Sequence, residues 1–304
     1  MANKSVLAII VLFNPDFSTL SRLLISVVNQ VEKIIIVDNT PNANTEELKK
    51  VFLQFNNKII YKPLGDNYGI AAAQNVGIKF SQGNSFSHVL LLDQDSELPL
   101  SMVRDLLDAE HKLLNNNIQV AAVGPAFIDE KTGEKAPAIN VKLLHTKKIP
   151  IDENKEYIKS DYIIASGSLI RTNILSKFGM MDEKLFIDWV DIEWGERCNK
   201  LGYYTFIIPS VLMKHSIGDD FVKFTGKNIN LHTDFRNYFI VRNATYLLFN
   251  NSLRFRSRLL FLFKIPCYII FYSTVSKRKI YSVGLLCKAV IDGFFRNMYK
   301  GHFK

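Results

Sequence analysis

The sequence predicts an α/β protein with a mainly parallel central sheet and a basic helical extension at its C-terminal end. Strand-length apolar runs alternate with segments of helical spacing over the first 95 residues, which is typical of parallel sheets with right-handed crossovers. The composition, 48% hydrophobic and 22% charged, is that of a folded chain. The net charge is +9, and residues 254–304 hold eleven Lys/Arg, eleven Phe/Tyr and one acid, so the positive excess lies in that stretch.

The N-terminal half supplies the predicted sheet. Residues 6–13 are all apolar, as in a strand buried on both faces, and Asn14-Pro15 ends the run. Residues 17–31 follow with helical spacing. Further strands are predicted at 33–37, 58–62 and 88–92, and further helices at 44–55 and 71–80. Ligands of such sheets bind beyond the carboxyl ends of the strands.

The middle of the chain is more mixed. Strands are predicted at 120–128, 162–170 and 204–208, helices at 173–178 and 191–201, and a loop or hairpin at 130–150. From about residue 226 the pattern becomes helical and basic. These features divide the chain into an α/β domain at 1–225 and a helical, basic region at 226–304.

The cysteines and the N-terminal residues indicate in which cellular compartment the protein is expected. Three cysteines without a CxxC pair exclude a disulfide framework and a cysteine zinc site, and they favour a reducing cytoplasm. No signal peptide is predicted, because the first apolar run continues directly into sequence typical of a folded domain.

Asp93-Gln94-Asp95 follows the strand predicted at 88–92. Residues two apart in an extended segment point the same way, so both carboxylates face one site. Mg²⁺ and Mn²⁺ are bound by such oxygen ligands together with substrate phosphates. The alternative is an Asp-rich turn in solvent.

Residues 67–77 combine small residues with a predicted helix start. Such a segment allows close approach of a ligand, and a helix N-terminus favours phosphate. The alternative is a plain helix start with Ala/Gly packing. Asp38, after an earlier strand, is suited to accept hydrogen bonds from a ribose or base, or to cap a helix.

The segment 186–197 is acidic. Glu193 and Arg197 have the spacing of a helical ion pair, which leaves Asp191 at the helix start, free to act as a base. Trp189 is either a stacking surface for a sugar or core, and the alternative for the whole segment is an acidic amphipathic helix. His215, in a Gly-containing turn after a strand, is either structural or a ligand of metal or phosphate.

Taken together and in this order, these segments resemble glycosyltransferase family 2, an inverting family with the GT-A fold. The resemblance spans about residues 5–245. Within the family, the opening Val11-Leu12-Phe13-Asn14-Pro15, the version Asp93-Gln94-Asp95-Ser96 of the DxD motif and the segment 186–194 are most similar to bacterial rhamnosyltransferases. Those enzymes use dTDP-L-rhamnose to build O-antigens and other surface polysaccharides.

The resemblance implies roles for individual residues. A divalent cation, Mg²⁺ or Mn²⁺, would lie on Asp95 with Asp93 and His215, and Asp191 would be the catalytic base. The family's glutamate before that aspartate is Val190 here, so Asp188 is an alternative base; the Glu193–Arg197 spacing favours Asp191. The donor would contact Asn14, Asp38, Asn39, Asn67, Gly69, Asn75, Asp93 and Gln94. The acceptor would contact Gly167, Asp188, Trp189 and Arg242.

The basic, aromatic tail predicts contact with a membrane surface. Its most apolar stretch, 259–275, has seventeen residues and is interrupted by Lys264 and Pro266, whereas a span needs about twenty apolar residues. We therefore expect helices lying on an anionic bilayer. The resemblance implies an undecaprenyl-diphosphate-linked acceptor and a peripheral position on the cytoplasmic face of the bacterial inner membrane.

Several alternatives stay open at this point. The tail can instead be a helical cap on the catalytic domain or a contact between copies in a homo-oligomer. Nucleic-acid binding is disfavoured because the tail has no recognisable binding module. The chain can also be a nucleotide-binding module without catalysis, or a transferase that uses UDP-galactofuranose or UDP-glucose.

Overall fold

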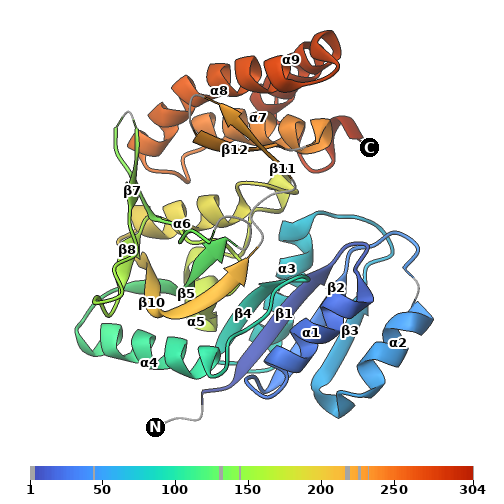
Figure 1. Cartoon of the computed structure of the whole chain (residues 1–304), viewed down its shortest axis with the longest axis vertical. Coiled ribbons are helices and arrows are strands. Elements are labelled where there is room, and N and C mark those ends of the chain that lie inside the picture. The colour runs from blue at the N-terminus through green and yellow to red at the C-terminus, as the bar shows by residue number, and fades with distance from the viewer. Residues whose placement is uncertain are drawn as a thin grey trace.

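The computed structural model of the chain describes residues 4–43, 45–129, 133–143, 145–215, 220–224, 227–231 and 233–303. Its centre is an eight-stranded sheet of order β3-β2-β1-β4-β9-β5-β10-β8 (Figure 1). The strands that run in one direction are β1 (Val6–Leu12), β2 (Lys33–Asp38), β3 (Ile59–Pro63), β4 (His88–Asp93), β5 (Val120–Asp129) and β10 (Tyr204–His215). The short strands β8 (Ile158–Ser160) and β9 (Leu169–Arg171) run antiparallel to their neighbours. The mainly parallel α/β sheet is therefore confirmed.

Alternate residues of the central strands bury against different layers, as the period of two requires. On one face Ala8 and Ile10 pack with α1 (Phe17–Val27), α2 (Thr45–Leu53) and α4 (Met102–Asn115). On the other, Leu7 and Ile9 pack with α3 (Ile70–Gly83), α5 (Thr172–Phe178) and α6 (Val190–Lys200). Because both faces are covered, the strands read as continuous apolar runs rather than alternating ones.

Two small hairpins stand outside the main sheet. One pairs β6 (Ala138–Val141) with β7 (Thr146–Ile149), within the segment predicted as a loop or hairpin. The other pairs β11 (Asp220–Phe224) with β12 (Lys227–Leu231). Short 3₁₀ turns lie at Asn56–Lys58, Glu183–Leu185 and Gly301–Phe303.

The structure corrects the element predictions in three places. Helix does not begin at 226, because 227–231 alternates polar and apolar residues and pairs as a strand. The strand predicted at 162–170 is reduced to β9, and the residues before it form a turn around Gly167, whose φ is +76°. The sequence assigned no element to 102–115, which is α4.

The C-terminal helices α7 (Asp234–Phe249), α8 (Phe255–Val275) and α9 (Lys279–Phe294) lie together beyond α6 (Figure 1). Their apolar side chains share one cluster with the α3–α5–α6 face of the sheet. At the start of α8, Arg254 binds Glu196 of α6 and lies 3.0 Å from an oxygen of Asp161. The tail is thus packed onto the catalytic body. The boundary predicted at 225/226 falls on residues outside those that the structure describes.

Among the described residues, α8 is the one helix long and apolar enough to cross a membrane by length and composition. It has 21 residues, and its most apolar window has a mean hydropathy of 1.4, with 28% of that window buried. Pro266 lies inside it without ending it. The prediction that the segment is too short to span was therefore wrong as a statement about length.

Candidate functional site

The strands that carry the predicted acids end side by side. In the sheet register Leu12 of β1 lies opposite Asp38 of β2, and Val11 lies opposite Asp93 of β4. The two acids therefore flank the end of β1 at the carboxyl edge. The sheet thus brings together residues that lie 55 positions apart in sequence.

Asp38 is fully buried at this edge. One carboxylate oxygen accepts a hydrogen bond of 2.7 Å from the hydroxyl of Tyr61, and the other accepts one of 3.0 Å from the backbone N–H of Thr40. Tyr61 lies on β3, next to β2 in the sheet. Sequence reasoning missed it, because the pairing of β2 with β3 is not visible in the chain.

Asn39 and Asn67 hold the loop before α3. The Asn39 amide nitrogen donates to Oδ1 of Asn67 at 2.8 Å, and Asn39 Oδ1 accepts from the N–H of Tyr68 at 2.8 Å. Oδ1 of Asn67 also accepts from the N–H of Gly69 at 3.0 Å. The two residues predicted to bind the nucleotide-sugar donor are therefore hydrogen-bonded to each other, and together they fix the path of the loop.

Gly69 brings this loop against the segment that precedes the predicted base. Its φ is +89°, and a Cβ there would lie 2.5 Å from the carbonyl oxygen of Phe186. The same oxygen accepts a 2.7 Å hydrogen bond from the N–H of Ile70, the first residue of α3. This N–H at the helix start, expected to be available for phosphate, is thus used to attach the base segment to the donor loop.

Asn75 does not face an open pocket. Its side chain is 2% exposed and exchanges hydrogen bonds with the backbone of Met181 and the carboxylate of Glu183, at 2.8 to 3.0 Å. Direct donor contact by Asn75 is therefore corrected to a positioning role: it attaches α3 to the loop that leads to α6.

The DxD segment and the end of β1 are locked together. The side-chain amide of Gln94 accepts from the N–H of Phe13 at 2.8 Å and donates to its carbonyl at 3.1 Å. Asn14, exposed and with a φ of +47°, follows, and its N–H donates to Thr40 at 2.8 Å. Gln94 therefore orders the loop between β1 and α1 rather than offering a free amide.

The two carboxylates of the motif differ in exposure. Asp93 is half-buried and Asp95 is exposed. A β-bridge between Glu97 and Lys214 brings the end of β10, and with it the backbone of His215, beside this segment. The side chain of His215 lies outside what the structure describes. Within the described residues no cluster of three or more metal-ligating side chains is found.

The segment before α6 is strained. Phe186, Asp188 and Trp189 have φ angles of +66°, +61° and +68°. Positive φ is costly for residues with a side chain, and such strain persists only where surrounding contacts hold it. Here the Asn243 amide donates to the carbonyls of Leu185, Ile187 and Asp188, at 2.8 to 3.1 Å.

Asp191 lies half-buried in the first turn of α6. Its oxygens accept hydrogen bonds from the N–H groups of Ile192 at 2.8 Å and Ala165 at 3.2 Å. The pKa of Asp191 is raised to about 6, and burial is the largest cause. The two backbone hydrogen bonds oppose this increase, and the nearby charges of Asp93 and Asp188 add to it. A carboxylate with a pKa near 6 is suited to accept a proton at neutral pH.

Asp188, the alternative base, is held by a side-chain cation rather than by backbone N–H groups. Asp188 forms an ion pair with Arg236, whose Nη2 lies 2.6 Å from its Oδ1. The carboxylate of Asp188 is thus engaged by a side-chain cation, whereas the carboxylate of Asp191 is held by two backbone N–H groups. The geometry therefore favours Asp191.

Two predicted acceptor residues are buried. The guanidinium of Arg242 is enclosed, donates to the carbonyls of Tyr299 at 2.6 Å and Leu185 at 2.9 Å, and lies over the ring of Phe239. Gly167 is packed against Pro125. The acceptor role predicted for both is corrected: Arg242 fastens α7 to the strained segment, and Gly167 permits a tight turn.

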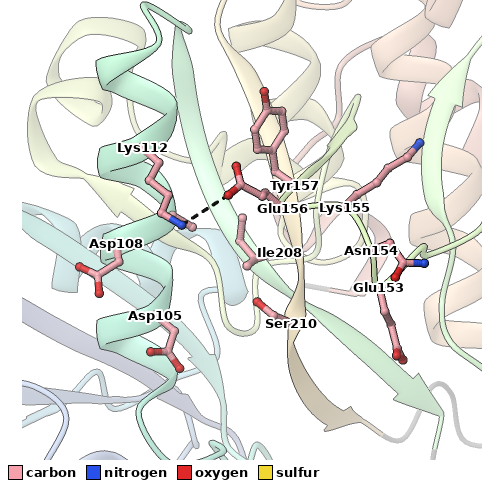
Figure 2. A pocket seen from close by; sticks show the side chains of 11 residues that line it. Asp105, Asp108, Lys112, Glu153, Asn154, Lys155, Glu156, Tyr157, Ile208 and Ser210 are labelled. Carbon is pink, nitrogen blue, oxygen red and sulfur yellow. Dashed lines mark ion pairs between the residues drawn. The ribbon is translucent and has the colours of Figure 1, made fainter.

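A different hollow, of about 410 Å³, lies between α4 and residues 153–157 (Figure 2). Four carboxylates and two lysines line it, with Lys112 3.5 Å from Glu156. An excess of negative charge disfavours a nucleoside diphosphate there. None of its lining residues is a predicted site residue.

Comparison with known proteins identifies the family. A sequence profile described as Glycosyl transferase family 2 matches residues 7–179. The chain belongs to glycosyl transferase family 2. It is 36% identical over 254 residues, 82% of this chain and 81% of the relative, to the dTDP-rhamnosyl transferase RfbF of Shigella flexneri. It is 27% identical over 225 residues, 71% of this chain, to an uncharacterized glycosyltransferase of Methanocaldococcus jannaschii.

Solved structures agree on the fold of this family 2 enzyme. The TarS 1–349 structure of S. aureus in complex with UDP-GlcNAc superposes with a TM-score of 0.57 at 14% identity, covering 95% of this chain and 83% of that chain. GalNAc-T7 with UDP, GalNAc and Mn²⁺ gives 0.59 at 15% identity, over 91% of this chain and 58% of that chain. The predicted GT-A fold is confirmed, and the chain is a glycosyltransferase.

Proposed function

We propose that the protein is an inverting rhamnosyltransferase that moves L-rhamnose from dTDP-L-rhamnose to a hydroxyl of a lipid-linked glycan, in the synthesis of O-antigen or another surface polysaccharide. The observation that carries this proposal is the 36% identity to a dTDP-rhamnosyl transferase over 82% of the chain. A second relative, 27% identical over 48% of this chain, is the minor teichoic acid biosynthesis protein GgaB of Bacillus subtilis, also a surface-polymer protein by its name.

Asp191 carries the proton in the proposed reaction. Its carboxylate removes the proton of the acceptor hydroxyl as that oxygen forms a bond to the anomeric carbon. The bond from that carbon to the diphosphate breaks on the opposite side, and dTDP leaves with the electron pair. One displacement inverts the anomeric centre and needs no enzyme nucleophile, so the protein contributes positioning and electrostatics.

Asp93 and Asp95 are suited to hold a divalent cation with the donor. Mg²⁺ is commonly bound by one or two carboxylates together with substrate phosphates, and these two acids lie half-buried and exposed at the sheet edge. His215 ends β10, and the residue before it, Lys214, forms a β-bridge with Glu97. When bound, the cation supplies positive charge against the diphosphate leaving group. The solved complex of GalNAc-T7 with Mn²⁺ supports a divalent cation, and we propose Mg²⁺ or Mn²⁺.

A donor screen tests the sugar. Purified protein is incubated with dTDP-L-rhamnose, UDP-galactose, UDP-galactofuranose, UDP-glucose or GDP-mannose, with EDTA, Mg²⁺ or Mn²⁺, and released nucleoside diphosphate is measured. We expect release from dTDP-L-rhamnose, dependent on the metal. Release from a UDP-sugar alone would overturn the rhamnose assignment, and equal release in EDTA would overturn the metal.

The surface of the tail supports contact with lipid. Large apolar side chains on α8 and α9 are exposed, including Phe263 at 53% and Ile270 at 67%. An apolar groove of about 350 Å³ lies between α7, α8 and α9, with Leu262 and Phe294 among its lining residues. Monomeric proteins rarely expose such patches without a partner. We propose a peripheral site on the cytoplasmic face of the inner membrane, where the acceptor lipid would lie.

Flotation with anionic liposomes tests whether the tail contacts a membrane surface. Truncating the tail is unsuitable because Arg254 binds Glu196 and the N–H of Tyr299 donates to the carbonyl of Lys184, both in the body, and Phe303 packs on Phe239 of α7. We therefore use the full chain with Phe263→Glu and Ile270→Glu, against the control Leu53→Glu, which changes a still more exposed apolar residue on α2. The double variant is expected to lose flotation and the control to keep it. Unchanged flotation of the double variant would refute membrane contact through α8.

A further inference from the structure

Three tyrosines that the mechanism does not use lie around the start of α6. Tyr268 and Tyr272 are one turn apart on α8, with ring centroids 5.9 Å apart and planes at 24°. Tyr268 also lies 6.4 Å from the ring of Trp189, which precedes the helix that bears Asp191. Tyr162 lies in the segment that leads to Ala165, the residue whose N–H binds Asp191. The tail helix α8 therefore stands beside the base segment.

The hydroxyls of these tyrosines have no protein partner among the described residues. Buried tyrosines elsewhere in the chain are satisfied: Tyr238 donates to Asp292 and Tyr246 to Asp182. Tyr272 is only 7% exposed, yet its hydroxyl makes no such bond. Within the residues that the structure describes, five side-chain atoms are sealed without a partner and none of them belongs to these tyrosines, so the three hydroxyls reach solvent. A hydroxyl that reaches solvent from a largely buried ring is available to hydrogen-bond a bound ligand.

The carboxylates at the site act on two of these hydroxyls, those of Tyr162 and Tyr272. Burial raises the pKa of Tyr162, and the charge of Asp191 raises it further. Burial, and then the charge of Asp188, raise the pKa of Tyr272 to about 12. Tyr162 also packs on α6 itself, since a Cβ on Gly195 of that helix would lie 2.8 Å from the Cβ of Tyr162. All three hydroxyls stay protonated at neutral pH and can donate as well as accept hydrogen bonds.

We propose that Tyr162, Tyr268 and Tyr272, together with the ring of Trp189, form a wall of the acceptor subsite, so that the tail helix α8 takes part in selecting the sugar acceptor. This inference rests on the proposed function. Aromatic rings with polar tips offer an apolar face and a hydroxyl to the same ligand, which suits a sugar ring. A site that hydrogen-bonds substrate hydroxyls also rejects ligands that lack them.

Removal of one hydroxyl at a time tests the wall without changing its shape. Tyr162→Phe, Tyr268→Phe and Tyr272→Phe are made in the full chain, with Tyr281→Phe on α9, an exposed residue, as matched control. Octyl glycosides of rhamnose, galactose and N-acetylglucosamine serve as acceptor probes. We expect the best probe to bind wild type and to lose about threefold to tenfold in affinity per hydroxyl, measured by ligand-observed NMR and as acceptor KM. The control should bind as wild type.

Donor hydrolysis by water separates this idea from the proposed function. Hydrolysis of dTDP-L-rhamnose without acceptor, and the donor KM, should be unchanged in the three variants. A raised donor KM with unchanged glycoside binding would overturn the acceptor wall, as would failure of every glycoside to bind wild type. If glycoside binding depends on the tyrosines but dTDP-L-rhamnose is not a substrate, the rhamnose assignment fails and the wall stands.

Discussion

The ammonium group of Lys300, four residues before Lys304, lies 2.8 Å from the carboxylate of Asp66 in the loop that leads to α3. The hydrogen bond from Lys300, and then one from the N–H of Asn67, hold the pKa of Asp66 below its usual range. The same C-terminal segment inserts Phe303 among Phe235, Tyr238 and Phe239. The end of the tail is therefore attached to the predicted donor loop.

Reversing that ion pair is the first prediction. Lys300→Asp and Asp66→Lys each place like charges together and should weaken donor binding by about threefold to fivefold, since an exposed pair has a modest effect. The double exchange should restore binding to near the wild-type value. Titration with dTDP measures it, and failure of the double variant to recover would show that the contact does not position the loop.

Gly69 and Gly65 form a matched pair for a second prediction. Both have a positive φ, +89° and +81°, but a Cβ at Gly65 meets nothing within 4 Å, whereas one at Gly69 meets Phe186. Gly65→Ala should cost about 1–2 kcal/mol of stability from backbone strain alone. Gly69→Ala should cost more and also lower donor affinity and turnover. Thermal unfolding and donor titration measure this, and equal effects would mean that the Phe186 contact is unimportant.

Asp191 gives a third prediction. Asp191→Asn should reduce turnover by about 100-fold to 10,000-fold, the usual contribution of a positioned base, with donor binding nearly unchanged. Asp188→Asn should retain more activity, because that acid is paired with Arg236. Full turnover by Asp191→Asn together with an inactive Asp188→Asn would make Asp188 the base.

The pH profile checks the same residue independently. The base must be ionised, and burial raises its pKa to about 6. The value of kcat/KM should therefore rise as pH increases through about 6 and level off above it. An acid limb centred near 4 would show that Asp191 is not desolvated in the working enzyme. Stability of the protein is followed over the same range as control.

A buried charge network far from the site gives a fourth prediction. His88, at the start of β4, lies 2.8 Å from Glu110, and Arg171 lies 3.2 Å from the other oxygen of the same carboxylate. Glu110→Ala would leave Arg171 without its buried acid and should destabilise the fold by about 3–5 kcal/mol. Glu156→Ala, which breaks an exposed pair with Lys112, should change stability by less than about 1 kcal/mol. Urea unfolding measures both, and similar values would contradict the assignment.

Much of the fold was predictable because its signals are local. The apolar run at 6–12 and the helical spacing after it identify β1 and α1 with no knowledge of their neighbours. The turn around Gly167 was not predictable as such, since 162–170 is rich in apolar residues and reads as a strand. Pairing partners decided that only 169–171 joins the sheet.

The candidate site also has a part that the sequence predicted and a part that only the structure showed. Asp38, Asp93 and Asp191 were predicted as site residues from residue type and from their position after predicted elements, and the sheet edge brings the first two together. Arg242 and Asn75 were assigned to ligands because they are polar, but both are buried and use their hydrogen bonds within the protein. Polarity alone does not tell a ligand contact from an internal one.

The basic tail shows which features follow from the sequence and which follow only from the tertiary structure. The sequence by itself determined its charge, its aromatic content and its helical pattern, because composition and periodicity are local properties. Only the tertiary structure decided that Arg254 binds Glu196, that Lys300 reaches Asp66, and that α8 stands beside Trp189. These contacts join residues that are 58 to 234 positions apart, and chain packing rather than local preference selects such pairs.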